Sequence, residues 1–106
     1  MKTLNLTMLT AVRLALMIDA SQGNRKDLRT LGDVRRRLGI SDETLQSVVK
    51  PVAGGAVISD EVKTMPDIGL TLAPEEARRL LEVIDAQTFT VRDLEWVEPL
   101  VKDLAA

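Results

Sequence analysis

The chain contains an internal repeat, which limits the folds that its sequence can adopt. Residues 4–40 (the N-terminal unit) align with residues 70–106 (the C-terminal unit) at a constant offset of 66 positions, without a gap. Eleven of the 37 aligned positions are identical: Leu4/Leu70, Leu6/Leu72, Ala11/Ala77, Arg13/Arg79, Leu14/Leu80, Ile18/Ile84, Asp19/Asp85, Ala20/Ala86, Asp27/Asp93, Leu28/Leu94 and Leu38/Leu104. A register unbroken through a loop favours a duplicated unit over chance similarity between leucine-rich segments.

The spacing of apolar residues predicts a strand, a helix, a polar turn and a second helix in each unit. Residues 4–6 and 70–72 alternate apolar and polar side chains, as half-buried strands do. Pro74 suits the first position of a helix, and the sequences Asn24 to Asp27 and Thr90 to Asp93 resemble helix caps. In the C-terminal unit, one buried helix face has the spacing i, i+3, i+4, i+7: Ala77, Leu80, Leu81 and Ile84.

The segment between the units, residues 41–69, predicts an insert made of a helix and a hairpin. Ser41 caps a short helix that extends to about Val49 and ends before Pro51. A turn at Gly54-Gly55, a strand at residues 56–58 and a polar connection over residues 60–69 complete the insert.

These elements predict one domain, residues 1–106, of the α+β class and predominantly helical. Two strand-helix-helix units share a small sheet, with the insert between them. Phe89 and Trp96 are the only aromatic residues, so the core has to be aliphatic. Each large side chain that becomes fully buried contributes ~1.5–3 kcal/mol.

Charge divides unequally between the two units. The N-terminal unit has seven basic and three acidic side chains, and the C-terminal unit has four basic and eight acidic ones. This difference could steer one unit onto the other, or onto a neighbouring molecule. The alternative is that both faces are solvated, where a surface ion pair contributes only ~0–1 kcal/mol.

A stripe of three apolar residues distinguishes the first helix of the N-terminal unit. Leu9, Val12 and Leu16 occupy the positions that are Glu75, Arg78 and Glu82 in the other unit. The first helix is therefore apolar on nearly all sides, which predicts burial on nearly all sides. Either the insert covers the stripe, which we favour, or the stripe is a protein-binding or dimer face.

Residues 31–50 resemble a helix-turn-helix with Gly39 in its turn, which would place residues 42–49 in the major groove of DNA. Arg35, Arg36 and Arg37 then form a candidate patch for phosphates or for an acidic partner. Against DNA binding, the second helix begins with two acidic residues, and the net charge of the chain is −2. A run of three charges on a helix is also typical of a solvated face.

The composition excludes several kinds of catalytic site. The chain has no cysteine, histidine or tyrosine, which removes thiolate nucleophiles, imidazole-based triads and Cys/His zinc sites. Gly54-Gly55 lacks the lysine and hydroxyl residue of a phosphate loop. Asp19 and Asp85 are repeat partners that could converge on a metal, although ending two matched helices is the simpler role. We expect no catalytic, cofactor or metal site, and no enzyme.

The first twenty residues superficially resemble a signal peptide, but Arg13 interrupts the apolar run. Asp19 stands where a cleavage site needs a small residue. No stretch approaches the ~20 apolar residues of a membrane span. We therefore expect a cytoplasmic protein with no membrane partner.

Three stretches, LTMLTAVRLALMI, LGDVRRRLGISDETLQ and IGLTLAPEEARRLLEVI, resemble a class of short, uncharacterised proteins encoded by bacteriophages and prophages. The resemblance covers most of the chain and implies a small accessory protein that binds a host or virion component. It carries over no functional residues.

We expect from the sequence a non-enzymatic protein-interaction module. Its partner would be another protein or a second copy of the chain in a homodimer. The alternative is a winged-helix-like regulator that binds DNA through residues 31–50.

Overall fold

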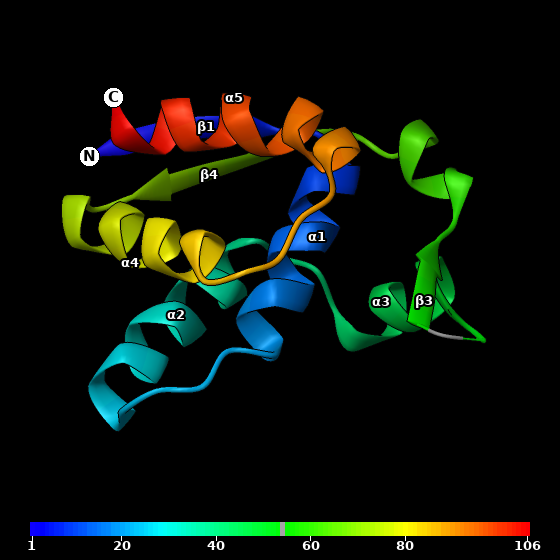
Figure 1. Cartoon of the computed structure of the whole chain (residues 1–106), viewed down its shortest axis with the longest axis horizontal. Coiled ribbons are helices and arrows are strands. Elements are labelled where there is room, and N and C mark those ends of the chain that lie inside the picture. Colours follow the sequence, from blue (N-terminus) through cyan, green and yellow to red (C-terminus); the bar gives the residue numbers. More distant parts are fainter. Residues whose placement is uncertain (54) are drawn as a thin grey trace.

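The computed structural model of the chain describes residues 1–53 and 55–106 (Figure 1). Its main sheet pairs β1 (Lys2–Leu6) with β4 (Ile68–Leu72) in antiparallel orientation. Both strands bury their leucines and expose the polar residues between them, which confirms the predicted alternation.

Each strand leads into two helices. In the N-terminal unit these are α1 (Met8–Asp19) and α2 (Arg25–Arg37). In the C-terminal unit, α4 (Pro74–Asp85) is followed by a 3-10 turn, η2 (Val91–Asp93), and by α5 (Leu94–Ala105). At the offset of 66, α1 and α4 have the same bounds, and η2 starts where α2 starts. The strand-helix-helix order is therefore present in both units, which share one sheet.

The pairing of β1 with β4 is symmetric about its central pair. Leu4 lies opposite Leu70, and these two residues are also partners in the repeat. The end pairs, Lys2 with Leu72 and Leu6 with Ile68, exchange when the two units are exchanged. An antiparallel pair keeps its hydrogen-bond pattern under a two-fold rotation, so the register is compatible with two units related in this way.

Local hydrogen bonds explain where the helices begin. The Asn24 side chain accepts a bond from the Asp27 N–H at 2.9 Å. Thr90 and Asp93 cap each other: the Thr90 hydroxyl accepts from the Asp93 N–H at 3.3 Å, and the Asp93 carboxylate accepts from the Thr90 N–H at 3.0 Å. Pro74 is the first residue of α4. The predicted helix starts are confirmed.

The insert consists of α3 (Asp42–Val48), a hairpin of β2 (Val49–Val52) and β3 (Gly55–Ile58), and a 3-10 turn, η1 (Asp60–Thr64). It extends to one side of the main sheet, in green in Figure 1.

The sequence analysis missed two parts of the insert. The strand β2 follows α3 directly and includes Pro51, which was expected only to end the helix. The polar connection contains η1, which begins where the Ser59 hydroxyl accepts from the Glu61 N–H at 3.3 Å. The predicted strand at residues 56–58 is confirmed as part of β3. The predicted turn at Gly54-Gly55 lies outside the described residues.

The core is aliphatic, as expected, and both units contribute to it. Equivalent residues such as Leu14 and Leu80 are almost fully buried, as are Ile18 and Ile84. Phe89 and Trp96 are only partly buried, against the edge of this core. Across the residues that the structure describes, no helix combines the length and the apolar character needed to cross a membrane.

Candidate functional site

Two pairs of identical repeat residues contribute to the contacts between the units. Arg79 of α4 forms an ion pair with Asp27 of α2, with Nη2 and Oδ1 2.8 Å apart. Arg79 also binds Glu82 of its own helix at 2.5 Å. Arg79 and Asp27 correspond in the repeat to Arg13 and Asp93. The two units therefore contribute the same residue types to this contact, in exchanged roles.

At the equivalent contact, the indole ring of Trp96 lies between Arg13 and Asp93. The Arg13 guanidinium is 4.7 Å from the centre of the Trp96 ring, which is a cation–π distance. The Trp96 Nε1–H donates to Asp93 Oδ1 at 3.4 Å. Phe89 packs edge-on against Trp96 with ring centres 5.8 Å apart. This arrangement is called the aromatic cluster below: Arg13, Phe89, Asp93 and Trp96.

Hydrogen bonds fix the charge of the carboxylate in the aromatic cluster. The backbone N–H of Thr90 is the main cause that lowers the pKa of Asp93, followed by the Thr90 hydroxyl and the Trp96 N–H. The positive charge of Arg13 lowers this pKa further. Asp93 is therefore a stable anion that accepts from the indole at neutral pH.

In the N-terminal unit, the corresponding place is an open pocket of about 420 Å³ between α2 and α4. Gly23 and Thr30 stand in the repeat positions of Phe89 and Trp96. Neither residue lines the pocket, and neither has an aromatic ring. We call this site the α2–α4 pocket. Its lining includes Asp27, Leu28, Leu31, Arg79, Glu82 and Val83.

The apolar stripe on α1 is mostly covered. Val12 is fully buried, and Leu9 and Leu16 are partly buried against the core. Residues of β3 and η1 line a cavity together with Leu9, so the insert lies along this side of α1. The structure therefore places Leu9, Val12 and Leu16 together on α1 but does not leave them as one exposed face.

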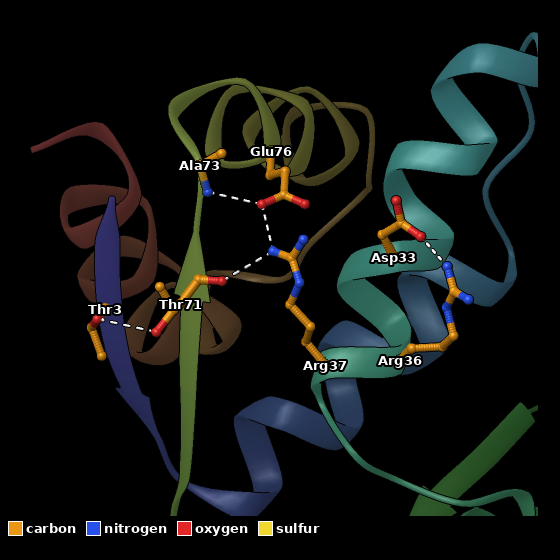
Figure 2. Close-up of polar contacts among 7 residues, drawn as sticks. All are labelled: Thr3, Asp33, Arg36, Arg37, Thr71, Ala73 and Glu76. Atoms are coloured by element: carbon orange, nitrogen blue, oxygen red, sulfur yellow. Dashed lines mark hydrogen bonds and ion pairs between the residues drawn. The ribbon is translucent and has the colours of Figure 1, made fainter.

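The three consecutive arginines have different surroundings. Arg35 binds Asp19 at 3.1 Å and the Ile40 carbonyl at 2.8 Å. Arg36 points outward, with 78% of its side chain exposed, and pairs with Asp33 on the same helix. Figure 2 shows Arg36 and Arg37 directed to opposite sides of α2. The run Arg35, Arg36, Arg37 is therefore not one continuous exposed patch.

Arg37 joins α2 to the second unit. Its Nη1 donates to Glu76 at 2.5 Å and to the Thr71 carbonyl at 3.1 Å (Figure 2). Glu76 also accepts from the Ala73 N–H at 2.8 Å and is only 8% exposed. The hydrogen bond from Arg37 is the main cause that lowers the pKa of Glu76, and burial opposes it. The same bond raises the pKa of Arg37.

The segment that resembles a helix-turn-helix forms two helices joined by a tight turn. Gly39 has φ +68°, a left-handed conformation that suits glycine. The Ser41 hydroxyl accepts from the Thr44 N–H at 3.2 Å and starts α3, which the sequence predicted. The exposed first turn of α3 has Asp42 and Glu43.

Asp19 and Asp85, the repeat partners considered for metal binding, end α1 and α4. The carboxylate of Asp19 is engaged by Arg35. Within residues 1–53 and 55–106, no three acidic, histidine or cysteine side chains gather as metal ligands would.

Compared with known protein families, curated proteins and solved structures, the chain has no match. The sequence analysis missed the α2–α4 pocket and the contacts that join the units. A signal was present in the repeat, because Arg13/Arg79 and Asp27/Asp93 are identical charged pairs. These pairs can be interpreted as contacts between the units only when it is known that the two units pack against each other.

Proposed function

We propose that the protein is a non-enzymatic interaction module that binds another protein through the α2–α4 pocket. One observation carries this proposal: the pocket is open at the place where the C-terminal unit has the aromatic cluster. The same backbone arrangement thus has two partly buried aromatic side chains on one side, and no aromatic residue at the equivalent positions on the other.

The lining of the α2–α4 pocket has the character of a protein-binding site. Leu28 is 40% exposed at the pocket, and Arg79, Asp27 and Glu82 supply charged groups around it. Apolar surface with a few fixed polar groups favours specific binding of a side chain. Interfaces concentrate their binding energy in residues that fill such pockets.

The resemblance to small phage and prophage proteins supports an accessory role with a host or virion protein as partner. A protein of this size binds such a partner through a small number of anchoring contacts, and the α2–α4 pocket is suited to receive one of them. Cytoplasmic localisation is part of this proposal.

A peptide-display selection on the intact protein tests the proposal. Peptides that bind through the pocket should lose binding to a Leu28→Asp variant. Leu94→Asp is the matched control, because Leu94 is the repeat partner of Leu28 and is also 40% exposed. Peptides that bind both variants equally, or no enriched peptides, would contradict the proposal.

Light scattering at micromolar concentration determines whether the partner is a second copy of the chain. A dimer that Leu28→Asp dissociates and Leu94→Asp leaves intact would identify the pocket as a homodimer contact. A monomer in all three proteins would support a different protein as the partner.

DNA binding is a second candidate, favoured by the helix–turn–helix geometry of α2, Gly39 and α3. Binding to random duplex DNA across a salt series tests it, because log affinity falls with log salt by ~0.9 for each phosphate neutralised. Arg36→Ala should reduce this slope if α2 contacts phosphates. Absence of binding at low salt would exclude this candidate.

A further inference from the structure

We propose that the α2–α4 pocket binds a tryptophan side chain of the partner, an inference that rests on the proposed function. The aromatic cluster shows how the two units together hold an indole. Arg79 and Asp27, the repeat partners of the residues that hold it, lie together at the α2–α4 pocket without an indole.

The polar groups of the pocket match those that contact Trp96. In the aromatic cluster, an arginine lies over the ring and an aspartate accepts from the indole nitrogen. Their repeat partners, Arg79 and Asp27, both line the α2–α4 pocket. Because Asp27 Oδ1 pairs directly with Arg79, an indole there can stack on the face of the Arg79 guanidinium and donate its N–H to Asp27 Oδ2. Phenylalanine and leucine can supply only part of this pattern.

The space available also fits a side chain from outside. The volume of about 420 Å³ falls within the ~300–1,000 Å³ of small-ligand sites.

Glu82 makes this pocket different from the aromatic cluster, where the equivalent residue is Leu16. The Glu82 carboxylate binds Arg79 Nη1 at 2.5 Å and the Asp27 carboxylate binds Nη2 at 2.8 Å, so two acidic groups hold the guanidinium. This fixes the arginine before a ligand arrives, which lowers the entropy lost on binding.

Titration with N-acetyl-tryptophanamide, followed by NMR of the intact protein, tests the inference. The backbone amide signals of Asp27, Leu28 and Arg79 should shift, and N-acetyl-leucinamide should give much smaller shifts. Arg79→Gln should weaken binding at least ~3-fold, the scale of one lost cation–π contact. Arg78→Gln is the matched control and should leave binding unchanged, because Arg78 is an exposed neighbour outside the pocket lining.

Equal shifts with the two compounds, or shifts confined to other parts of the protein, would overturn the inference. The display selection separates this failure from failure of the proposed function. Enriched peptides that lack tryptophan but depend on Leu28 would leave the interaction module standing and remove the tryptophan specificity. Tryptophan-containing peptides that depend on both Leu28 and Arg79 would support both.

A second variant fills the pocket from inside. Gly23→Phe combined with Thr30→Trp copies the aromatic residues of the C-terminal unit. The new indole should occupy the space over Arg79, and the folded variant should no longer bind N-acetyl-tryptophanamide. A folded double variant that binds the compound as tightly as the original protein would contradict the proposed location. If the double variant does not fold, the comparison of Arg79→Gln with Arg78→Gln decides the question.

Discussion

The N-terminal and C-terminal units have the same backbone plan but complete their packing differently. Both start from a strand, turn into a helix, and place an arginine from that helix against the start of the other unit's second helix. In the C-terminal unit, Phe89 and Trp96 fill the place next to this arginine. The repeat partners of these aromatic residues are Gly23 and Thr30, and a pocket lies beside the equivalent arginine, Arg79.

This difference shows that repeated backbone elements can be packed differently by the side chains at equivalent positions. The surrounding arginine and aspartate are the same in both places. At the aromatic cluster they contact Trp96, whereas at the α2–α4 pocket they pair directly with each other.

The charges of the two units lead to a related conclusion. Arg37 pairs with Glu76 in the direction expected from a basic N-terminal unit and an acidic C-terminal unit. In the pair of Arg79 with Asp27, by contrast, the acidic unit supplies the arginine and the basic unit supplies the carboxylate. The close contacts between the units therefore depend on particular residues and geometry, and not on net charge alone.

The largest expected effect tests whether the two halves of the core are equivalent. Leu14→Ala and Leu80→Ala should each lower the free energy of unfolding by ~2–5 kcal/mol, because both side chains are almost fully buried. The two losses should agree within ~1 kcal/mol. Denaturant unfolding measures both, with the exposed Val91→Ala as the control. A large loss from one substitution only would show that the units are packed differently at the centre.

A substitution in the aromatic cluster should give the next largest effect, and this effect should be absent at the equivalent position of the N-terminal unit. Trp96→Ala should lower the free energy of unfolding by ~2–3 kcal/mol, less than the ~3–5 kcal/mol for a fully buried aromatic, because Trp96 is half-buried. The equivalent change Thr30→Ala should stay within ~0.5 kcal/mol. Similar losses for the two substitutions would contradict the contrast between a filled and an open site.

Acid should weaken the contact between α2 and the C-terminal unit. Because the pKa of Glu76 is lowered in the folded state, the unfolded chain binds more protons than the folded chain as the pH falls, which lowers the free energy of unfolding. The stabilisation is complete above the ordinary glutamate pKa of ~4.3 and is lost as pH falls through the lower pKa of the folded state. Glu76→Ala should cost ~0.5–2 kcal/mol at pH 7, the scale of a lost helix cap.

Unfolding measured at pH 7 and in acid tests this dependence, with Glu75→Ala as the matched control. Glu75 is the exposed neighbour of Glu76, and its nearest ion pair is within its own helix. The difference between the two variants should decrease in acid. A difference that stays constant with pH would show that the charge of Glu76 does not contribute.

The smallest effects are expected at exposed basic residues in equivalent positions. Arg36→Ala and Lys102→Ala should each change the free energy of unfolding by no more than ~0.5 kcal/mol. Arg36 is largely exposed, and its ion pair lies within one helix. Thermal unfolding can compare both variants with Arg35→Ala, which removes contacts to Asp19 and the Ile40 carbonyl. Equal effects for Arg35 and Arg36 would contradict their different surroundings.

The elements that the sequence predicted are those specified by local signals. Apolar spacing and the caps at Asn24 and Thr90 depend only on nearby residues, and the corresponding helices start where expected. The strand β2 was missed because Pro51 is unfavourable in most strands, although the edge of a two-stranded hairpin tolerates it. The sequence therefore predicted a turn, and not a strand, after the helix.

The candidate site could not be predicted in the same way. The α2–α4 pocket is lined by residues between positions 20 and 31 and by Arg79, which is more than forty residues away in sequence. Such a pocket is visible only when the packing of one unit against the other is known. The arginine run shows the reverse problem, because adjacent residues on a helix point in different directions and meet different partners.

The symmetric pairing of β1 with β4 has a consequence for association. Each unit supplies surfaces that the other unit needs, so two chains could exchange units and make the same contacts between molecules. Residues 41–69 join the units covalently, and a short tether of this kind holds its ends at an effective concentration on the order of millimolar. The closed single chain is therefore favoured at lower protein concentrations, and removing the insert would shift the balance towards exchanged dimers.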